Sequence, residues 1–321
     1  MELSSEKKLP KWKALILASR PPFLQVTLSS VMAGILIAWI HQGAIDAFLA
    51  VLVVLVAVFL HLSVNLIHEY WDWKSGTDNI NVNAFRPFTG GSGMIQLGAI
   101  SPTEELVFGL SLMFLGAILG IYILIIVHEA LIPLLLIGFI AIFSIIFYTG
   151  SPIKLAHRGV GEFFVFLNFG PLMALGAYIV LTRNIHLEPV IVGSLIGLLT
   201  AGILIINEFP DAEADEKAGK KHLVVRLGLA KARYLYAIVM ILPYILTVTF
   251  ALMHMLPITI LITLLGLPHA LKIVRICFRH YNDFKALFPA NIGTIKNHLI
   301  YSLLVIIAYL ITGFFPITFF Y

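Results

Sequence analysis

Acidic residues gather in two short segments of this chain, and each segment directly follows a long apolar run. The segments span residues 65–78 and 207–221, and each opens with an asparagine. Carboxylate and amide oxygens suit Mg²⁺, which proteins typically hold with one or two carboxylates plus phosphate oxygens of a substrate. Two such segments that face each other across a cavity could hold a pair of ions around one diphosphate.

The spacing within each segment places its polar side chains together if the segment is helical. Positions i, i+3, i+4 and i+7 of a helix share one face, and in the first segment they are Asn65, His68, Glu69 and Asp72. In the second segment, every fourth position is polar: Asn207, Asp211 and Asp215. Pro210 predicts a break or kink between them. The alternative is that these acids are solvated or pair with nearby lysines, but ionisable groups at the edge of a membrane are functional candidates by default.

The composition requires a membrane to surround most of the chain. Of the 321 residues, 60% are hydrophobic and only 12% are charged, whereas a soluble domain has roughly 25% charged residues. The net charge of +4 could suggest a nucleic-acid partner, but lysines and arginines also collect in the cytoplasmic loops of membrane proteins. We therefore expect a lipid bilayer and no nucleic acid as a partner. The single cysteine, Cys277, allows no internal disulfide.

Nine apolar runs are long enough to cross the hydrocarbon core, which takes roughly 20 residues. The sequence therefore predicts an all-α, polytopic membrane protein with one domain over residues 1–321 and a basic interfacial segment over residues 1–20. Short turns alternate with long connections, which are 68–103, 149–161, 207–232 and 275–297. The predicted spans are 22–41, 46–67, 104–127, 131–148, 162–182, 187–206, 233–253, 256–274 and 298–319.

The positive charges predict how the bundle is oriented. Of the 21 lysines and arginines, 20 fall before the first span, in the four long connections or at the span ends that adjoin them, and only Arg183 falls on the other side. Loops rich in Lys and Arg stay in the cytoplasm. We expect the N-terminus and both acidic segments on the cytoplasmic side of the cell membrane.

Several runs resemble the UbiA superfamily of intramembrane prenyltransferases, which carries two aspartate-rich motifs after its second and sixth helices. The second motif matches Asn207, Asp211 and Asp215, followed by GKK and VRLG. The runs NEFPDAEADEKAGKKHLVVRLG, YTGSPIKLAHRGVGEFFVF, KSGTD and FRPFTGGSGMIQLGAISP resemble the branch that prenylates 1,4-dihydroxy-2-naphthoate for menaquinone. The first motif departs from the family pattern: His68 stands where an asparagine is expected, and Glu69 replaces an aspartate. This departure bears on the acceptor more than on the reaction class.

The resemblance implies an Mg²⁺-dependent transfer of a polyprenyl group from its diphosphate to an aromatic acceptor. Metal ions and basic side chains would stabilise the departing diphosphate, and an electron-rich aromatic carbon would then attack the allylic cation. The expected metal ligands are Asp72, Asp211, Asp215, Asn207 and Glu69. The expected catalytic or substrate-binding residues also include Lys154, Tyr148, Asn65, His68, Lys74, Arg86 and Arg158. For the four basic residues, the alternative is ordinary loop charge, and for Tyr148 it is an interfacial anchor.

Two rival functions fit some of these features. A transporter would also be a polytopic bundle with acids near helix ends, although transporters usually carry their charged groups near the midplane. A second rival keeps the superfamily but changes the acceptor to a lipid glycerol phosphate, a tetrapyrrole or another quinone precursor. The run Gly90-Gly91-Ser92-Gly93 lacks the lysine of a nucleotide-binding loop and is expected to form a lid near the site.

Overall fold

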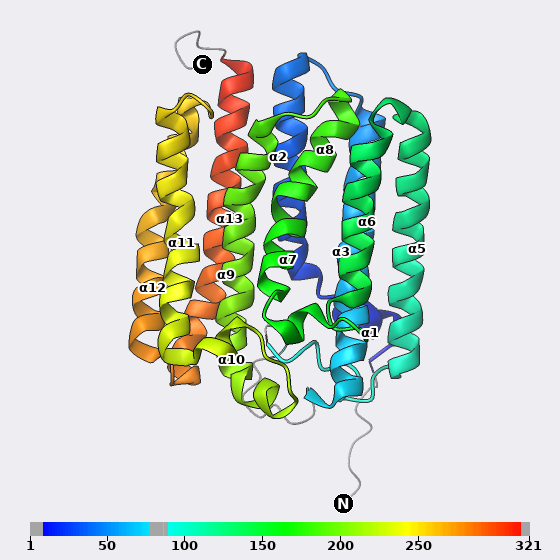
Figure 1. Ribbon diagram of the computed structural model, residues 1–321, viewed down its shortest axis with the longest axis vertical. Helices are drawn as coiled ribbons and strands as arrows, with labels where there is room; N and C mark the ends of the chain where they lie inside the picture. The colour runs from blue at the N-terminus through cyan, green and yellow to red at the C-terminus, as the bar shows by residue number, and fades with distance from the viewer. Residues whose placement is uncertain (1–8, 78–85, 87–88, 316–321) are drawn as a thin grey trace, which may run out of the picture.

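The computed structural model describes residues 9–77, 86 and 89–315, and Figure 1 shows a bundle of nearly parallel long helices. Within the described residues, nine helical segments are long and apolar enough to cross a membrane, which confirms the predicted number. Asp78 and the residues 316–319 of the predicted ninth span lie outside the described part. The nine segments are Lys11–Gln42, Ala47–Ser75, Pro102–Ile126, His128–Phe147, Gly161–Thr182, Leu187–Lys217, Leu229–Leu252, Ile258–His280 and Phe284–Phe314.

Side-chain caps set where several helices begin. Asp46 accepts hydrogen bonds from Phe48 N and Leu49 N, and α3 (Ala47–Ser75) begins there. Ser101 and Glu104 form a reciprocal capping box at the start of α5 (Pro102–Ile126). These caps satisfy backbone N–H groups that a helix cannot satisfy itself.

The first and last spans are composite or longer than the apolar pattern predicts. The first begins with α1 (Lys11–Ala18), passes through the 3₁₀ turn η1 (Pro21–Phe23) and continues as α2 (Leu24–Gln42). The last, α13 (Phe284–Phe314), follows α12 (Leu267–His280) after only three residues. The prediction of a long connection over 275–297 is therefore wrong. Apolar runs mark the hydrocarbon-spanning part of a helix, while charged residues can extend the helix into the interface.

Of the break or kink predicted at Pro210, the break is wrong, because α9 (Leu187–Lys217) runs through this residue. A proline in a helix leaves the carbonyl four residues earlier without its usual partner. Here that carbonyl belongs to Ile206, and the side chain of Asn291 on α13 donates a hydrogen bond to it at 3.0 Å. A neighbouring helix therefore supplies the missing donor, as is typical within membranes.

Helix α9 lies at the centre of the bundle, whereas α5 and α6 (Leu131–Phe147) lie at its edge (Figure 1). In the most apolar stretch of α9, 78% of the residues are buried, against 22% in α5 and 17% in the segment that contains α6. Lipid therefore has to solvate most of α5 and α6. Figure 1 also places α1 and α10 (Leu223–Leu227) at one end of the bundle and the last turn of α13 at the other.

Candidate active site

The two acidic segments meet at the end of the bundle that carries α10. The ammonium of Lys220 lies 3.5 Å from Oδ2 of Asp72 on α3 and 3.6 Å from Oδ2 of Asp215 on α9. All three side chains are largely buried, at 13%, 13% and 4% exposure. One positive charge is therefore shared by an acid from each segment. The sequence prediction assigned no role to Lys220, although it lies near the end of the second segment in the run Gly219-Lys220-Lys221.

His68 and Tyr148 lie next to Asp72 and its ion pair with Lys220. Nε2 of His68 lies 3.3 Å from Oδ2 of Asp72, and its ring meets the ring of Tyr148 edge-on with 4.8 Å between centroids. Burial raises the pKa of the Tyr148 hydroxyl well above its usual value, and the nearby Glu208 and Glu162 raise it further. Tyr148 therefore stays protonated at neutral pH and presents an uncharged ring to the site.

The glycine-rich turn lies against both acidic segments. Glu69 accepts hydrogen bonds from Ser92 N at 2.8 Å, from Ser92 Oγ at 2.6 Å and from Gly93 N at 3.1 Å. Gly90 N donates to Oδ2 of Asp211 at 3.3 Å. The carboxylate of Glu69 therefore holds this turn in place, and its role as a metal ligand stays a prediction. The turn does lie near the site, whereas its movement as a lid is untested.

The two asparagines that open the segments line a large cavity. Nδ2 of Asn65 donates to the carbonyl of Ser19 at 2.9 Å, and Oδ1 of Asn207 accepts from Nδ2 of Asn291 at 3.0 Å. Asn291 therefore supports both Asn207 and the proline-freed carbonyl of Ile206. The sequence prediction missed Asn291, because only the tertiary structure brings α13 against α9.

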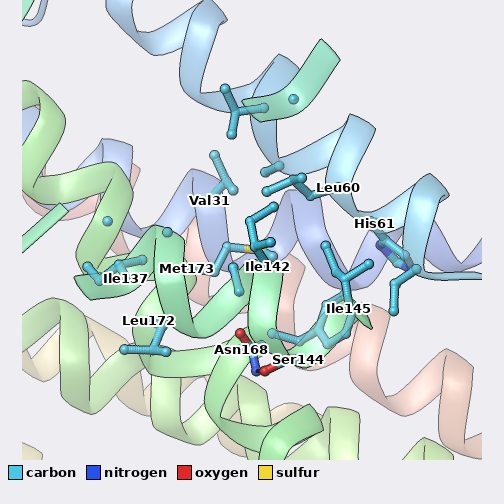
Figure 2. A pocket seen from close by; sticks show the side chains of 18 of the residues that line it. Val31, Leu60, His61, Ile137, Ile142, Ser144, Ile145, Asn168, Leu172 and Met173 are labelled. Carbon is cyan, nitrogen blue, oxygen red and sulfur yellow. Dashed lines mark hydrogen bonds between the residues drawn. The ribbon is translucent and has the colours of Figure 1, made fainter. Parts of the chain in front are cut away.

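The cavity has a volume of about 570 Å³ and is largely apolar. Its walls come from helices that include α2, α3, α5, α6 and α9, and α8 (Met173–Thr182) adds a further side. Figure 2 shows Ser144 and Asn168 together among apolar side chains such as Ile142 and Met173. The polar residues of the lining include Arg20, Asn65, His68, Tyr148, Asn168 and Asn207. An apolar chain could thus occupy the cavity, and His68 connects its lining to the acids through the contact with Asp72.

The four predicted loop cations differ in their surroundings. The ammonium of Lys74 lies over the ring of Trp71, 4.8 Å from its centroid, and Arg158 is exposed with Nε donating to the carbonyl of Ile153 at 2.6 Å. Lys154 precedes the turn η3 (Leu155–Arg158) with a φ of +50°. Arg86 lies against Gly93, where an added Cβ would be 2.7 Å from its Nη1. Their diphosphate-binding roles stay predictions.

Asp215 also contacts a buried histidine, His222, which in turn contacts Glu208. Nε2 of His222 lies 2.9 Å from Oδ2 of Asp215, and its Nδ1 lies 3.4 Å from Oε2 of Glu208. Glu162, at the start of α7 (Gly161–Leu167), accepts a hydrogen bond from Leu223 N at 2.5 Å. The sequence prediction gave no role to His222 or Glu208. Half-buried His157 also lies near the Lys220 ammonium. Burial and this ammonium lower the pKa of His157 to about 4, so that its imidazole is neutral at pH 7.

A polytopic bundle with a largely apolar cavity, one of whose lining residues contacts a buried carboxylate, defines a membrane-embedded protein suited to a lipid-like substrate. The chain belongs to the UbiA prenyltransferase family, whose profile matches residues 27–288. It is therefore a transferase of prenyl groups.

Relatives and a solved structure agree with this family. The chain is 33% identical over 241 residues to the 1,4-dihydroxy-2-naphthoate octaprenyltransferase of Haemophilus influenzae, covering 73% of this chain and 74% of the relative. Its identity to the Escherichia coli protein of the same description is 26% over 306 residues, covering 94% and 97%. A UbiA homolog from Archaeoglobus fulgidus bound to GPP and Mg²⁺ has the same fold, with a TM-score of 0.57, 16% identity, and coverage of 91% of this chain and 99% of that chain.

Proposed function

We propose that this protein transfers a polyprenyl group from a polyprenyl diphosphate to 1,4-dihydroxy-2-naphthoate, releasing diphosphate. The observation that carries the proposal is the Asp72–Lys220–Asp215 arrangement beside His68, a residue that contacts Asp72 and lines the apolar cavity. Relatives at up to 33% identity that are described as dihydroxynaphthoate octaprenyltransferases support this acceptor. The whole chain would act as one membrane domain in the cell membrane, with the site facing the cytoplasm.

The donor set fits Mg²⁺. Asp72, Asp211 and Asp215 offer carboxylates, and Asn207 offers an amide oxygen, which are the hard oxygen ligands that Mg²⁺ favours. Oδ1 of Asp72 is buried and accepts no hydrogen bond within the described part of the chain. The Lys220 ammonium already supplies a positive charge between two of these carboxylates. Bound Mg²⁺ would neutralise charge on the diphosphate as it leaves.

The chain's own residues would then complete the reaction. Lys220, together with the basic residues Lys154 and Arg158, would bind diphosphate oxygens through charge-assisted hydrogen bonds. The neutral ring of Tyr148 lines the cavity beside His68, and its π-face would stabilise the allylic cation. Attack by the aromatic carbon forms the new carbon–carbon bond, the carbon–oxygen bond to diphosphate breaks, and the acceptor loses a proton. His68, in the position of the family's asparagine, would contact the acceptor.

The test uses purified protein in detergent with octaprenyl diphosphate, Mg²⁺ and a panel of acceptors. We expect prenylated dihydroxynaphthoate and stoichiometric pyrophosphate, detected by mass spectrometry and an enzyme-coupled assay. EDTA should stop the reaction, and Mg²⁺ should restore it. Product formed only with a glycerol phosphate or a tetrapyrrole would reject the acceptor but keep the reaction class. Solute uptake into proteoliposomes without covalent product would reject both.

The metal assignment has a matched control in the same helix. Asp215→Asn should lower kcat by roughly a hundredfold or more, since charge stabilisation at the reacting group is typically worth this much. Glu213→Gln should stay within about twofold, because Glu213 is 66% exposed and pairs with Lys217 at 2.7 Å. Equal kcat values for the two variants would remove Asp215 from the site.

A further inference from the structure

A second group of potential ligands lies at the opposite end of the bundle from the acidic segments. His41 lies in the last turn of α2, while His186 and Glu188 lie at the start of α9. Nε2 of His41 is 2.8 Å from Oε2 of Glu188, and the rings of His41 and His186 are 4.7 Å apart at 81°. One ligand atom from each of the three residues lies within 4.8 Å of the other two.

Two buried tyrosines hold this group in position. The hydroxyl of Tyr309 on α13 donates to Oε1 of Glu188 at 2.7 Å, and the hydroxyl of Tyr178 on α8 lies 2.9 Å from Nδ1 of His41. Outer partners of this kind fix the orientation of metal-binding histidines and carboxylates. Oε2 of Glu188 and Nε2 of His41 thus point to one another, and four helices fix their positions.

A cavity of about 320 Å³ opens beside the group. It is lined by His41, His186 and Glu188 together with His254, and its remaining lining is Leu187, Ile191 and Met255. His254 has a φ of +55°, which is uncommon outside glycine and costs free energy. Three imidazoles therefore surround one space that also contains a carboxylate that is only 5% exposed.

We propose that His41, His186 and Glu188 bind a divalent transition-metal ion, with Zn²⁺ as the probe. Two imidazoles and one carboxylate are a ligand set that zinc takes in open sites, where solvent completes the coordination. Ligand atoms around tetrahedral zinc are roughly 3.3 Å apart, which follows from bond lengths of about 2.0–2.1 Å. Here Nε2 of His41 and Oε2 of Glu188 are 2.8 Å apart, and one ligand atom of each of the three residues lies within 4.8 Å of the other two, so that small side-chain shifts would reach this spacing.

The site differs from the proposed Mg²⁺ site in position and in chemistry. It contains two nitrogen ligands and one carboxylate, whereas Mg²⁺ prefers oxygen ligands. It also lies at the end of the bundle where α2 ends and α9 begins, away from α10 (Figure 1). The bound ion would join α2 to α9 and fix the mouth of the cavity, and His41 would then donate through Nδ1 to Tyr178.

The experiment measures zinc binding without measuring prenyl transfer, so its failure would leave the proposed function intact. Protein purified through a tag that contains no histidine is stripped with EDTA and titrated with Zn²⁺ against a chromophoric chelator. Metal content is checked by mass spectrometry, with Mg²⁺ present in millimolar excess. His186→Asn is the test variant, because His186 is exposed and caps α9 by accepting from Glu188 N, a role that asparagine also performs. His128→Asn is the control, because His128 is 74% exposed and precedes α6 at the same end of the bundle.

We expect one Zn²⁺ per chain in the unaltered protein and in His128→Asn, and at least tenfold weaker binding in His186→Asn. Co²⁺ substituted at the site should give the intense visible bands of four-coordinate cobalt, and His186→Asn should lose them. Absence of stoichiometric zinc in the unaltered protein would overturn the proposal, and so would equal affinity in the two variants. The His41–Glu188 contact would then be an ion pair or hydrogen bond that only joins helices.

Discussion

Lys220 contacts carboxylates of both acidic segments. Its ammonium lies between Asp72 and Asp215, two carboxylates that would otherwise repel each other in a largely buried space. A positive charge in that position stabilises the two acids next to each other, and in the proposed reaction it would do so until metal and substrate bind. Under the proposed function, Lys220 would compete with the metal for the carboxylates before the substrate binds. Its ammonium would then contact the diphosphate of the bound substrate.

This competition predicts a split between two kinetic constants. Lys220→Ala should raise KM for the prenyl diphosphate by roughly tenfold or more, because a hydrogen bond to a charged group contributes about 1.5–3 kcal/mol. It should also lower the Mg²⁺ concentration needed for half-maximal rate, because the competing ammonium is gone. Initial rates measured over a grid of both concentrations separate the two effects.

Lys217→Ala is the control for this change, since Lys217 is 65% exposed and pairs with Glu213. It should change neither constant by more than about twofold. A Lys220→Ala protein with an unchanged KM for the donor would remove Lys220 from diphosphate binding.

At the scale of elements, close packing of α9 against the segment before α8 decides where the second acidic segment lies. A Cβ added to Gly197 would lie 2.6 Å from the carbonyl oxygen of Phe166 and 2.9 Å from Cα of Gly170. Gly193, one turn earlier, meets the same segment, in which η4 (Asn168–Leu172) contains a wider helical turn. Small residues four apart let helix backbones approach closely within a membrane.

Gly197→Ala should therefore destabilise the protein by about 1–3 kcal/mol, the usual cost of overpacking. The change should lower the midpoint of thermal unfolding, followed by tryptophan fluorescence in detergent. Gly176→Ala on α8 is the matched control, because the nearest atom to its added Cβ is Cγ2 of Ile137 at 3.6 Å, an ordinary contact. Equal midpoints for the two variants would show that the approach of α9 can relax at little cost.

At the scale of the whole molecule, the cavity between the core helices and the peripheral α5 and α6 would set the length of isoprenoid chain that the proposed reaction can use. Gly120 on α5 and Gly138 on α6 both line this cavity, and an added Cβ at either would meet nothing within 4 Å. The space beside these glycines is therefore open, and lipid-exposed helices form its outer wall.

Gly120→Leu should shift the enzyme toward shorter donors. Added side-chain volume would exclude distal isoprene units, and a misfit of this size is worth about 1–3 kcal/mol, or at least about tenfold in the ratio of kcat/KM for geranyl to octaprenyl diphosphate. Competition between the two donors, with both products measured by mass spectrometry, gives this ratio directly.

Ile125→Phe adds volume on the same helix outside the cavity, where Ile125 is 69% exposed, and should leave the donor ratio unchanged. An unchanged ratio in Gly120→Leu as well would mean that the prenyl chain follows another route through the bundle.

The sequence alone determined the membrane architecture, because the signals for it are local. Nine apolar runs, each followed or preceded by charged residues, predict nine spans whatever their packing. The spacing of Asn207, Asp211 and Asp215 likewise predicts a polar helix face, since helical periodicity is a property of neighbouring residues. Helix ends were less predictable, because α9 continues past Pro210 only with the help of Asn291 from α13.

Contacts between distant parts of the chain were decided only by the tertiary structure. Lys220 and Asp72 are 148 positions apart, and His41 and Glu188 are 147 apart. No local pattern marks either pair, because packing of whole helices brings the side chains together. The paired acidic segments therefore were predictable as two separate polar faces, whereas their shared ammonium, the adjoining cavity and the histidine group at the opposite end follow from how α2, α3, α9 and α13 pack.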